Sequence, residues 1–112
     1  MGNKKLSPDL LQGTLDLLIL RALVHGPMHG YGIADRLKHV SDRVLEVGES
    51  SLYPALQRLL LNGDVRDEWG TSENNRRARY YTLTPRGRRR LTSEREEFQR
   101  MVTAIQQVLD LA

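Results

Sequence analysis

The stretch WGTSENNRRARYY, residues 69–81, decides how this chain folds. Its middle is polar and rich in arginine, and segments of strand-like composition flank it at Val65 to Trp69 and at Ala78 to Leu83. Asn74 and Asn75 favour a turn between these strands because asparagine tolerates left-handed backbone conformations. The pattern therefore predicts a β-hairpin whose turn carries several positive charges.

A leucine-rich helix is expected directly before this hairpin, from near Ser50 to Leu61, with Gly63 as its left-handed cap. At 100° per residue, one apolar face is formed by Leu52, Leu56, Leu59 and Leu60. The opposite face carries mainly small or polar residues, namely Ser50, Ser51, Pro54, Gln57, Arg58 and Leu61. Pro54 is expected in or just after the first turn, where it removes little or no helical hydrogen bonding.

The order helix, strand, basic turn and strand is typical of a winged helix. A polar face at the start of a helix can enter the major groove of DNA and reach the edges of the bases. For an isolated helix, a merely solvated surface is the alternative. The basic hairpin beside this helix favours the DNA-binding interpretation.

The positive charge of the chain is concentrated in one segment. The net charge is only +3 over 112 residues, but seven arginines and no acidic residue lie between Asn74 and Ser93. Arginine can hold a phosphate with two hydrogen bonds, so this segment favours a polyanionic partner. The candidate phosphate or minor-groove contacts are Arg76, Arg77 and Arg79. The later run from Arg86 to Arg90 is interpreted as the solvated start of a helix, with an electrostatic fringe as the alternative.

The composition excludes several classes of function. The chain has no cysteine, which removes disulfides, cysteine zinc sites and thiol nucleophiles. His25 and His29 have a metal-like spacing, but Gly26-Pro27 breaks any common helical face, so we expect no metal and no cofactor. The sequence offers no histidine paired with a nucleophile and an orienting acid, and no phosphate-binding glycine loop, so an enzyme is not expected.

The most apolar run, Leu17 to Val24, is interrupted by Arg21 and is shorter than the roughly 20 residues of a membrane span. No basic region followed by a hydrophobic segment marks a secretory signal. We therefore expect a cytoplasmic protein.

The first helix is expected to run from Ser7, its N-cap, to about Val24, and a second helix from Tyr31 to about Val40. Between Leu15 and Val24 the only charged side chains are Asp16 and Arg21. A helix that is apolar nearly all round must be covered on more than one side. Because the chain is small, this composition indicates a second subunit.

The final helix is expected to begin at Thr84-Pro85, an N-cap followed by proline, and to continue to the end of the chain. Leu91, Phe98, Ile105 and Ala112 recur every seven residues, which favours an apolar seam against another helix. About 25 residues at about 1.5 Å each give a length of about 40 Å, more than a small body can cover. We therefore predict dimerisation through this helix. A helix folded back on its own domain is the alternative.

Four motifs follow one another along the chain: GTLDLLIL at 13–20, GPMHGYGI at 26–33, SLYPAL at 51–56 and RYYTLT at 79–84, with Gly87 after them. In this order and spacing they resemble the PadR family of bacterial transcription regulators. The single C-terminal helix looks like the compact subfamily of these proteins, which lacks a larger C-terminal domain.

The resemblance implies a homodimeric winged helix-turn-helix protein, usually a repressor that binds an inverted repeat in double-stranded DNA. It also implies that the last helix packs against the first helix of the partner. Small members bind planar hydrophobic effectors between the subunits, often against a tryptophan that Phe98 replaces here. The expected fold is mainly α with a small β-hairpin (α+β), with a DNA-binding domain at 1–83 and a dimerisation helix at 84–112.

The expected DNA contacts are Ser50, Ser51, Tyr53, Pro54, Gln57, Arg58, Lys38, Asn75, Arg76, Arg77 and Arg79. The expected dimer contacts are Leu11, Leu15, Leu18, Leu91, Phe98, Met101, Val102, Ile105, Val108 and Leu109. The expected effector contacts are Leu11, Leu15 and Phe98.

Among the aromatic residues, Tyr53 is a candidate phosphate contact or a core aromatic. Trp69 is expected in the core or the hairpin, Tyr81 in the core, and Tyr31 against the helix that begins near Ser50. A winged helix that docks another protein is the alternative function, but such a domain has less reason to concentrate seven arginines.

Overall fold

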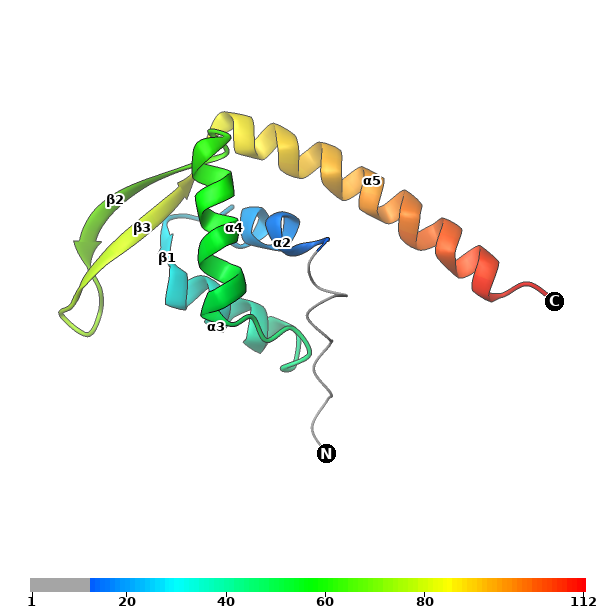
Figure 1. Ribbon diagram of the computed structural model, residues 1–112, viewed down its shortest axis with the longest axis horizontal. Helices are drawn as coiled ribbons and strands as arrows, with labels where there is room; N and C mark the ends of the chain where they lie inside the picture. Colours follow the sequence, from blue (N-terminus) through cyan, green and yellow to red (C-terminus); the bar gives the residue numbers. More distant parts are fainter. Residues whose placement is uncertain (1–12) are drawn as a thin grey trace.

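The computed structural model describes residues 13–112 and shows a small helical body with a hairpin on one side and a long helix on the other (Figure 1). The expected helix start at Ser7 and the expected dimer contact Leu11 lie outside the described residues. The described elements are α2 Leu15–Ala22, β1 Met28–His29, α3 Gly30–Val40, α4 Glu49–Leu61, β2 Val65–Thr71, β3 Arg77–Leu83 and α5 Pro85–Leu109. The predicted α+β fold with a small hairpin is confirmed.

Helices α2, α3 and α4 share one core with the base of the sheet. The largest fully buried apolar side chains are Ile19, Leu20, Leu23, Ile33, Leu56 and Leu59. The predicted core face of α4 is confirmed at Leu52, Leu56 and Leu59, whereas Ala55 is fully buried and Leu60 only half-buried. Truncation of one of the large side chains to alanine costs about 2–5 kcal/mol, so this core fixes the position of α4.

Both ends of α4 follow the sequence prediction closely. The helix begins at Glu49, so Pro54 lies just after the first turn and removes one helical hydrogen bond. At the other end Gly63 has the predicted left-handed conformation, with φ +76°. The amide of Asp64 donates to the carbonyl of Leu59 at 2.9 Å, which completes a Schellman motif. This sharp turn carries Asp64 back against the core.

The sheet has three antiparallel strands in the order β1-β3-β2. Strands β2 and β3 form the predicted hairpin, which is longer than expected because Thr71 still pairs with Arg77. Strand β1 was not predicted, since two residues are too short to show an alternating pattern. Its residues Met28 and His29 pair with Tyr81 and Tyr80. Through β1, the start of α3 is tied to the middle of the hairpin.

Helix α5 begins where the sequence predicted. The hydroxyl of Thr84 accepts a hydrogen bond from the amide of Gly87 at 3.0 Å, and Pro85 occupies the first turn. The first part of α5 packs against α2, where Leu91 is its only buried apolar side chain, and the rest extends away from the body (Figure 1). The alternative of a helix folded along its whole length on its own domain is therefore excluded.

Gly87 allows α5 to lie directly on the backbone that follows α4. A Cβ atom at this position would stand 2.1 Å from the carbonyl oxygen of Asp64 and 2.8 Å from Cδ1 of Leu83. Thr84 is bound to the same point, since its hydroxyl donates to the carbonyl of Gly63 at 2.7 Å and its amide to that of Asp64 at 3.1 Å. The ends of α4, β3 and α5 therefore meet with almost no space between them.

We expect Gly87→Ala to lower the free energy of unfolding by at least about 1–3 kcal/mol, because the new methyl group collides with backbone that cannot move alone. Thermal unfolding followed by circular dichroism measures the effect. Gly13→Ala is the matched control, since no heavy atom of residues 13–112 lies within 4 Å of its added Cβ. Equal stability of the two variants would contradict the close packing at this junction.

Candidate nucleic-acid interface

The outer face of α4 is open to solvent, as the sequence indicated. Its exposed residues include the predicted contacts Ser50, Ser51, Tyr53, Pro54 and Gln57. Their side chains are small, polar or aromatic, and they lie on the side opposite the core. Leu61, at the end of the helix, is the exposed aliphatic residue that the sequence placed on the same face. Lys38 is half-buried on α3 and lines a shallow hollow with Gly48, Glu49 and Tyr53 at the start of α4.

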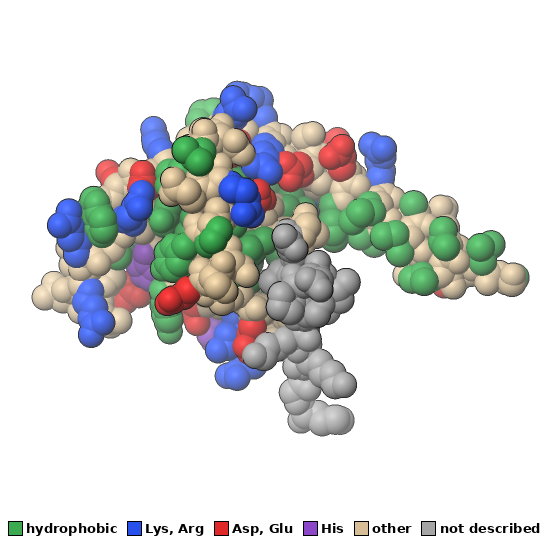
Figure 2. Space-filling view, viewed as in Figure 1, with side chains coloured by type: hydrophobic (Ala, Val, Ile, Leu, Met, Phe, Trp, Pro, Cys, Tyr) green, Lys and Arg blue, Asp and Glu red, His purple; other side chains and the backbone are tan. Residues whose placement is uncertain are grey.

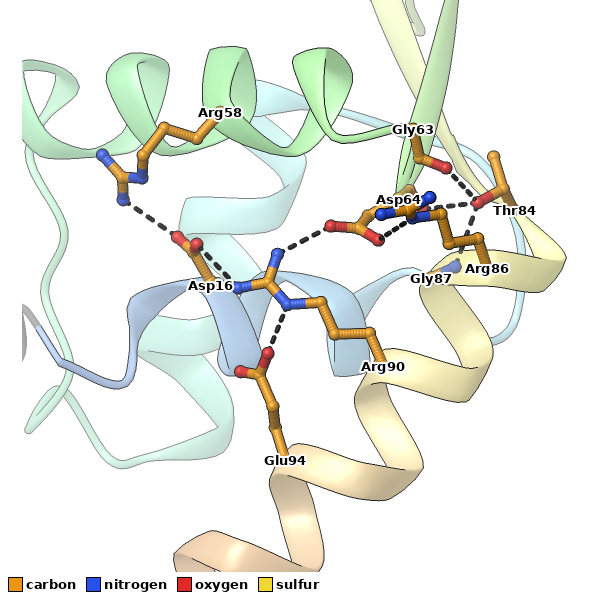
Figure 3. A network of polar contacts seen from close by, with 9 residues as sticks. All are labelled: Asp16, Arg58, Gly63, Asp64, Thr84, Arg86, Gly87, Arg90 and Glu94. Carbon is orange, nitrogen blue, oxygen red and sulfur yellow. Dashed lines mark hydrogen bonds and ion pairs between the residues drawn. The ribbon is translucent and has the colours of Figure 1, made fainter.

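Arg58 forms an ion pair that the sequence did not predict. Its guanidinium donates to the carboxylate of Asp16 on α2 at 2.9 Å (Figure 3). Its side chain is still 53% exposed, and the DNA contact of Arg58 stays a prediction.

On one face of the hairpin, two guanidinium groups lie near the indole ring of Trp69. In the register of the strands, Trp69 lies opposite Arg79, and Thr71 lies opposite Arg77. The guanidinium of Arg77 lies 4.4 Å from the centre of the Trp69 ring, and that of Arg79 lies 5.9 Å from it. At these distances a cation is attracted by the ring face. Trp69 is 57% exposed, so it belongs to the hairpin surface and not to the core.

The turn of the hairpin is compact. The amide of Asn75 donates to the carbonyl of Ser72 at 2.9 Å, and the amide of Ser72 donates to the carbonyl of Arg76 at 2.8 Å. Asn75 has φ +61°, which confirms the predicted left-handed turn residue. Arg76 and Arg77 are exposed beside this turn. Their charges are therefore presented at the tip of a well-defined loop.

Asp67 partly neutralises the hairpin. The guanidinium of Arg79 donates to this carboxylate through both Nε, at 2.7 Å, and Nη2. The hydrogen bond to Asp67 raises the pKa of Arg79, against the smaller opposing effect of burial. The arginine-rich segment contains no acid in sequence, but β2 supplies one in space. The charge available at the hairpin is therefore smaller than the sequence suggested.

A groove of about 550 Å³ separates the hairpin from the starts of α3 and α4. Tyr31 and Tyr53 line one side, and Trp69, Arg77 and Arg79 line the other. Tyr31 is 74% exposed, so it projects into solvent and is not packed against α4 as predicted.

Tyr81 closes the floor of this groove. It is buried, as predicted for a core aromatic, and burial raises the pKa of its phenol. The floor is therefore part of the rigid core.

His29 links α3 to the hairpin, a role that the sequence analysis missed. Its Nδ1 accepts a hydrogen bond from the amide of Gly32 at 2.9 Å and so caps α3. Its Nε2 lies 3.7 Å from the carboxylate of Glu73 in the hairpin turn. The centres of the His29 and Tyr80 rings lie 5.3 Å apart in an edge-to-face arrangement. A histidine directly before a helix was the available signal. Between residues 13 and 112 no group of three or more metal-ligating side chains comes together.

The projecting part of α5 carries an apolar strip. Figure 2 shows hydrophobic side chains gathered along this arm. Five predicted dimer contacts are between 39% and 72% exposed, namely Met101, Val102, Ile105, Val108 and Leu109. Phe98 is half-buried where the arm leaves the body, and Leu18 is half-buried on α2.

Two predicted dimer contacts need correction. Leu15 and Leu91 are only 3% and 9% exposed, because they fill the core between α2 and α5 within one subunit. The same burial removes Leu15 from the expected effector contacts, and Leu11 lies outside the described residues. Of the predicted effector contacts, the structure leaves Phe98 at the surface.

The geometry defines a winged helix. Helix α4 presents a polar outer face, β2 and β3 form a basic hairpin, and α5 protrudes from the body. Residues 19–93 match the PadR-like family of transcriptional regulators, and the chain belongs to this family. Its members regulate transcription by binding DNA and are not enzymes. No helix described between Gly13 and Ala112 is long and apolar enough to cross a membrane.

Solved structures of transcriptional regulators are similar to this chain, and so is the sequence of one uncharacterised protein from a transposon. A transcriptional regulator from Clostridium thermocellum is 30% identical, with a TM-score of 0.81 over 88% of this chain and 96% of that one. A PadR family regulator from Eggerthella lenta is 25% identical, with a TM-score of 0.80 over 93% and 88% of the two chains. An uncharacterised 37.1 kDa protein from a transposon of Streptomyces fradiae is 40% identical over 85 residues, but this chain spans only 23% of its length.

We expect Asp67→Asn to raise affinity for any DNA duplex, because it removes a negative charge and frees Arg79 for phosphate. The logarithmic salt slope should steepen by up to about 0.9, the contribution of one added phosphate contact. Fluorescence anisotropy of labelled DNA over a range of salt concentrations measures both quantities. Asp110→Asn, at the far end of α5, is the charge-matched control. A loss of affinity would mean that Asp67 serves chiefly to orient Arg79.

Proposed function

We propose that the protein is a homodimeric repressor that binds an inverted repeat in double-stranded DNA. The observation that carries the proposal is the groove between α4 and the hairpin, lined by tyrosines on one side and by arginines on the other. With α4 in the major groove, a phosphate backbone fits between these walls. Residues 1–83 form the DNA-binding part in this proposal, and residues 84–112 the dimerisation helix.

The charges of the groove suit a phosphate backbone. Arg76 and Arg77 are exposed and have no carboxylate within ion-pair distance in the described part of the chain, and Arg77 is held in place by the ring of Trp69. Tyrosine hydroxyls can donate to phosphate oxygens, and such contacts fix the register of a protein on DNA without reading sequence. We assign sequence recognition to the outer face of α4, which we call the reading helix. There the amide of Gln57 can donate to and accept from a base edge.

The homodimer rests on the apolar strip of α5. Its side chains repeat with the seven-residue spacing of a coiled coil and are exposed in the single subunit. A second copy of the same helix supplies a matching surface, and twofold symmetry then sets two hairpins and two reading helices on one side. Such a dimer fits half-sites one helical turn, about 34 Å, apart. Occupation of a promoter in the cytoplasm by this dimer excludes other proteins and so represses transcription.

Release by a small planar hydrophobic ligand forms the last part of the proposal. Phe98 lies where α5 leaves the body, and an aromatic ring there can stack on a flat ligand between subunits. A ligand that shifts the angle between subunits moves both half-site contacts together. Titration of a preformed protein–DNA complex tests this part, and a ligand that binds without release would contradict it.

We expect Arg77→Ala to weaken binding to all sequences and to flatten the logarithmic salt slope by about 0.9. Gln57→Ala should instead change the preferred sequence at one position of each half-site. Selection from genomic DNA fragments, followed by salt titrations, measures both. Arg100→Ala is the control, because this exposed arginine lies on the projecting part of α5, away from its apolar strip. No palindrome in the selected fragments, together with affinity that is independent of salt, would exclude the proposal.

We expect Ile105→Asp to convert the dimer into a monomer, because a carboxylate in the centre of the apolar strip meets its own copy across the twofold axis. Analytical ultracentrifugation gives the mass directly. Gln107→Asp adds the same charge on the opposite side of α5 and should remain dimeric. An Ile105→Asp variant that stays dimeric would place the interface elsewhere.

A further inference from the structure

Beyond the junction at Thr84 and Gly87, polar contacts of α5 contribute strongly to its anchorage on the body. Along its 25 residues, only Gly87 and Leu91 are buried. The polar contacts of its first turns are more numerous, and Arg90 is at their centre (Figure 3). Its guanidinium donates to Asp64 at 2.7 Å, to Asp16 at 3.3 Å and to Glu94. These three carboxylates come from three parts of the fold.

The same network reaches the reading helix. Asp16 uses its second oxygen to accept from Arg58 of α4 at 2.9 Å, so that Arg58, Asp16 and Arg90 form a chain from α4 through α2 to α5. Asp64 provides a second connection, because it follows the end of α4 directly and is only 2% exposed. Partial burial opposes the positive charge of Arg90, but its hydrogen bonds to Glu94 and Asp64 raise the pKa of this guanidinium. Arg90 therefore keeps its positive charge throughout the pH range of a cell.

Resting on the proposed DNA-binding dimer, we infer that Arg90 and Asp16 are positioning residues that set the separation of the two reading helices and so determine the half-site spacing that the protein accepts. They fix the angle between α5, through which the subunits join, and α4, through which each subunit reads DNA. Arg58 belongs to the same chain of ion pairs and acts on DNA through Asp16.

The length of α5 makes this angle important. Leu109 lies about 28 Å beyond Arg90 along the helix axis, at about 1.5 Å per residue. A tilt of about 7° at Arg90 therefore moves the end of the helix by about 3.4 Å, the rise of one base pair. The ion pairs of Arg90 with Asp16 and Asp64 join α5 to the body at this pivot, and weakening them permits tilts of this size. A duplex whose half-sites are one base pair too close or too distant is then accommodated by the protein instead of being strained.

The test uses the full-length protein and a set of duplexes with one half-site sequence and variable spacing. Wild type should prefer one spacing, and in Arg90→Gln and Asp16→Asn the penalty for one added or removed base pair should fall about tenfold, because deformation of the DNA is no longer required. Arg89→Gln is the control, because it removes the same charge from a neighbouring arginine that is exposed. Its spacing preference should match that of wild type.

Arg58→Gln separates a positioning role from a direct contact. If Arg58 acts through Asp16, the spacing preference relaxes and the salt slope stays the same. If it binds phosphate directly, the slope flattens and the spacing preference is kept, which overturns its assignment to the network. Asp16→Asn also guards against misfolding of Arg90→Gln, because Arg90 keeps its contacts with Asp64 and Glu94 in that variant.

A second measurement reports the angle without DNA. The chain has no cysteine, so Glu68→Cys on the exposed side of β2 gives one spin label in each subunit. The distribution of distances between the two labels should broaden in Arg90→Gln and Asp16→Asn but not in Arg89→Gln. Unchanged distances together with an unchanged spacing preference in both variants overturn the inference alone. A wild-type protein that selects only single half-sites overturns the proposed function and the inference with it.

Discussion

The placement of Asp64 is the constraint on which the rest of the structure depends. Its carboxylate is buried, its backbone carbonyl lies against Gly87, and the chain reaches it through the left-handed turn at Gly63. A buried charge is tolerated only with a partner, and loss of one partner from such a pair costs about 3–5 kcal/mol. Arg90 is the nearer partner of Asp64, at 2.7 Å, and Arg86 lies 3.7 Å from the other oxygen of the same carboxylate. Helix α4, the hairpin and α5 therefore diverge from a single point whose geometry leaves little freedom.

Much of the fold could be predicted because the ends of its helices and the turn of its hairpin depend on residues that are adjacent in the sequence. Thr84-Pro85 marks the start of α5, Gly63 marks the end of α4, and Asn75 marks the turn of the hairpin. Each of these signals depends on the conformation of one or two residues, which the sequence determines directly. The exposed face of α4 and the apolar strip of α5 follow from helical periodicity in the same way.

The parts that could not be predicted depend on pairs of residues far apart in the chain. Asp16 lies 42 residues from Arg58 and 74 from Arg90, so no local pattern relates them. Composition alone made the arginine-rich segment look uncompensated, although Asp67 lies across the hairpin from it. Leu15 shows the same limit for apolar residues: periodicity identifies a buried face, but it does not say whether the cover comes from the same subunit or another.

The hairpin contains the only tryptophan of the chain, and Trp69 lies directly beneath the guanidinium of Arg77. The emission of an indole depends on the charges and the water around it, and here the nearest charge is the guanidinium of Arg77 at 4.4 Å. Any polyanion that moves the guanidinium of Arg77 away from the ring must change the wavelength or the intensity of that emission. The intrinsic fluorescence of the unlabelled protein therefore indicates whether its hairpin is occupied.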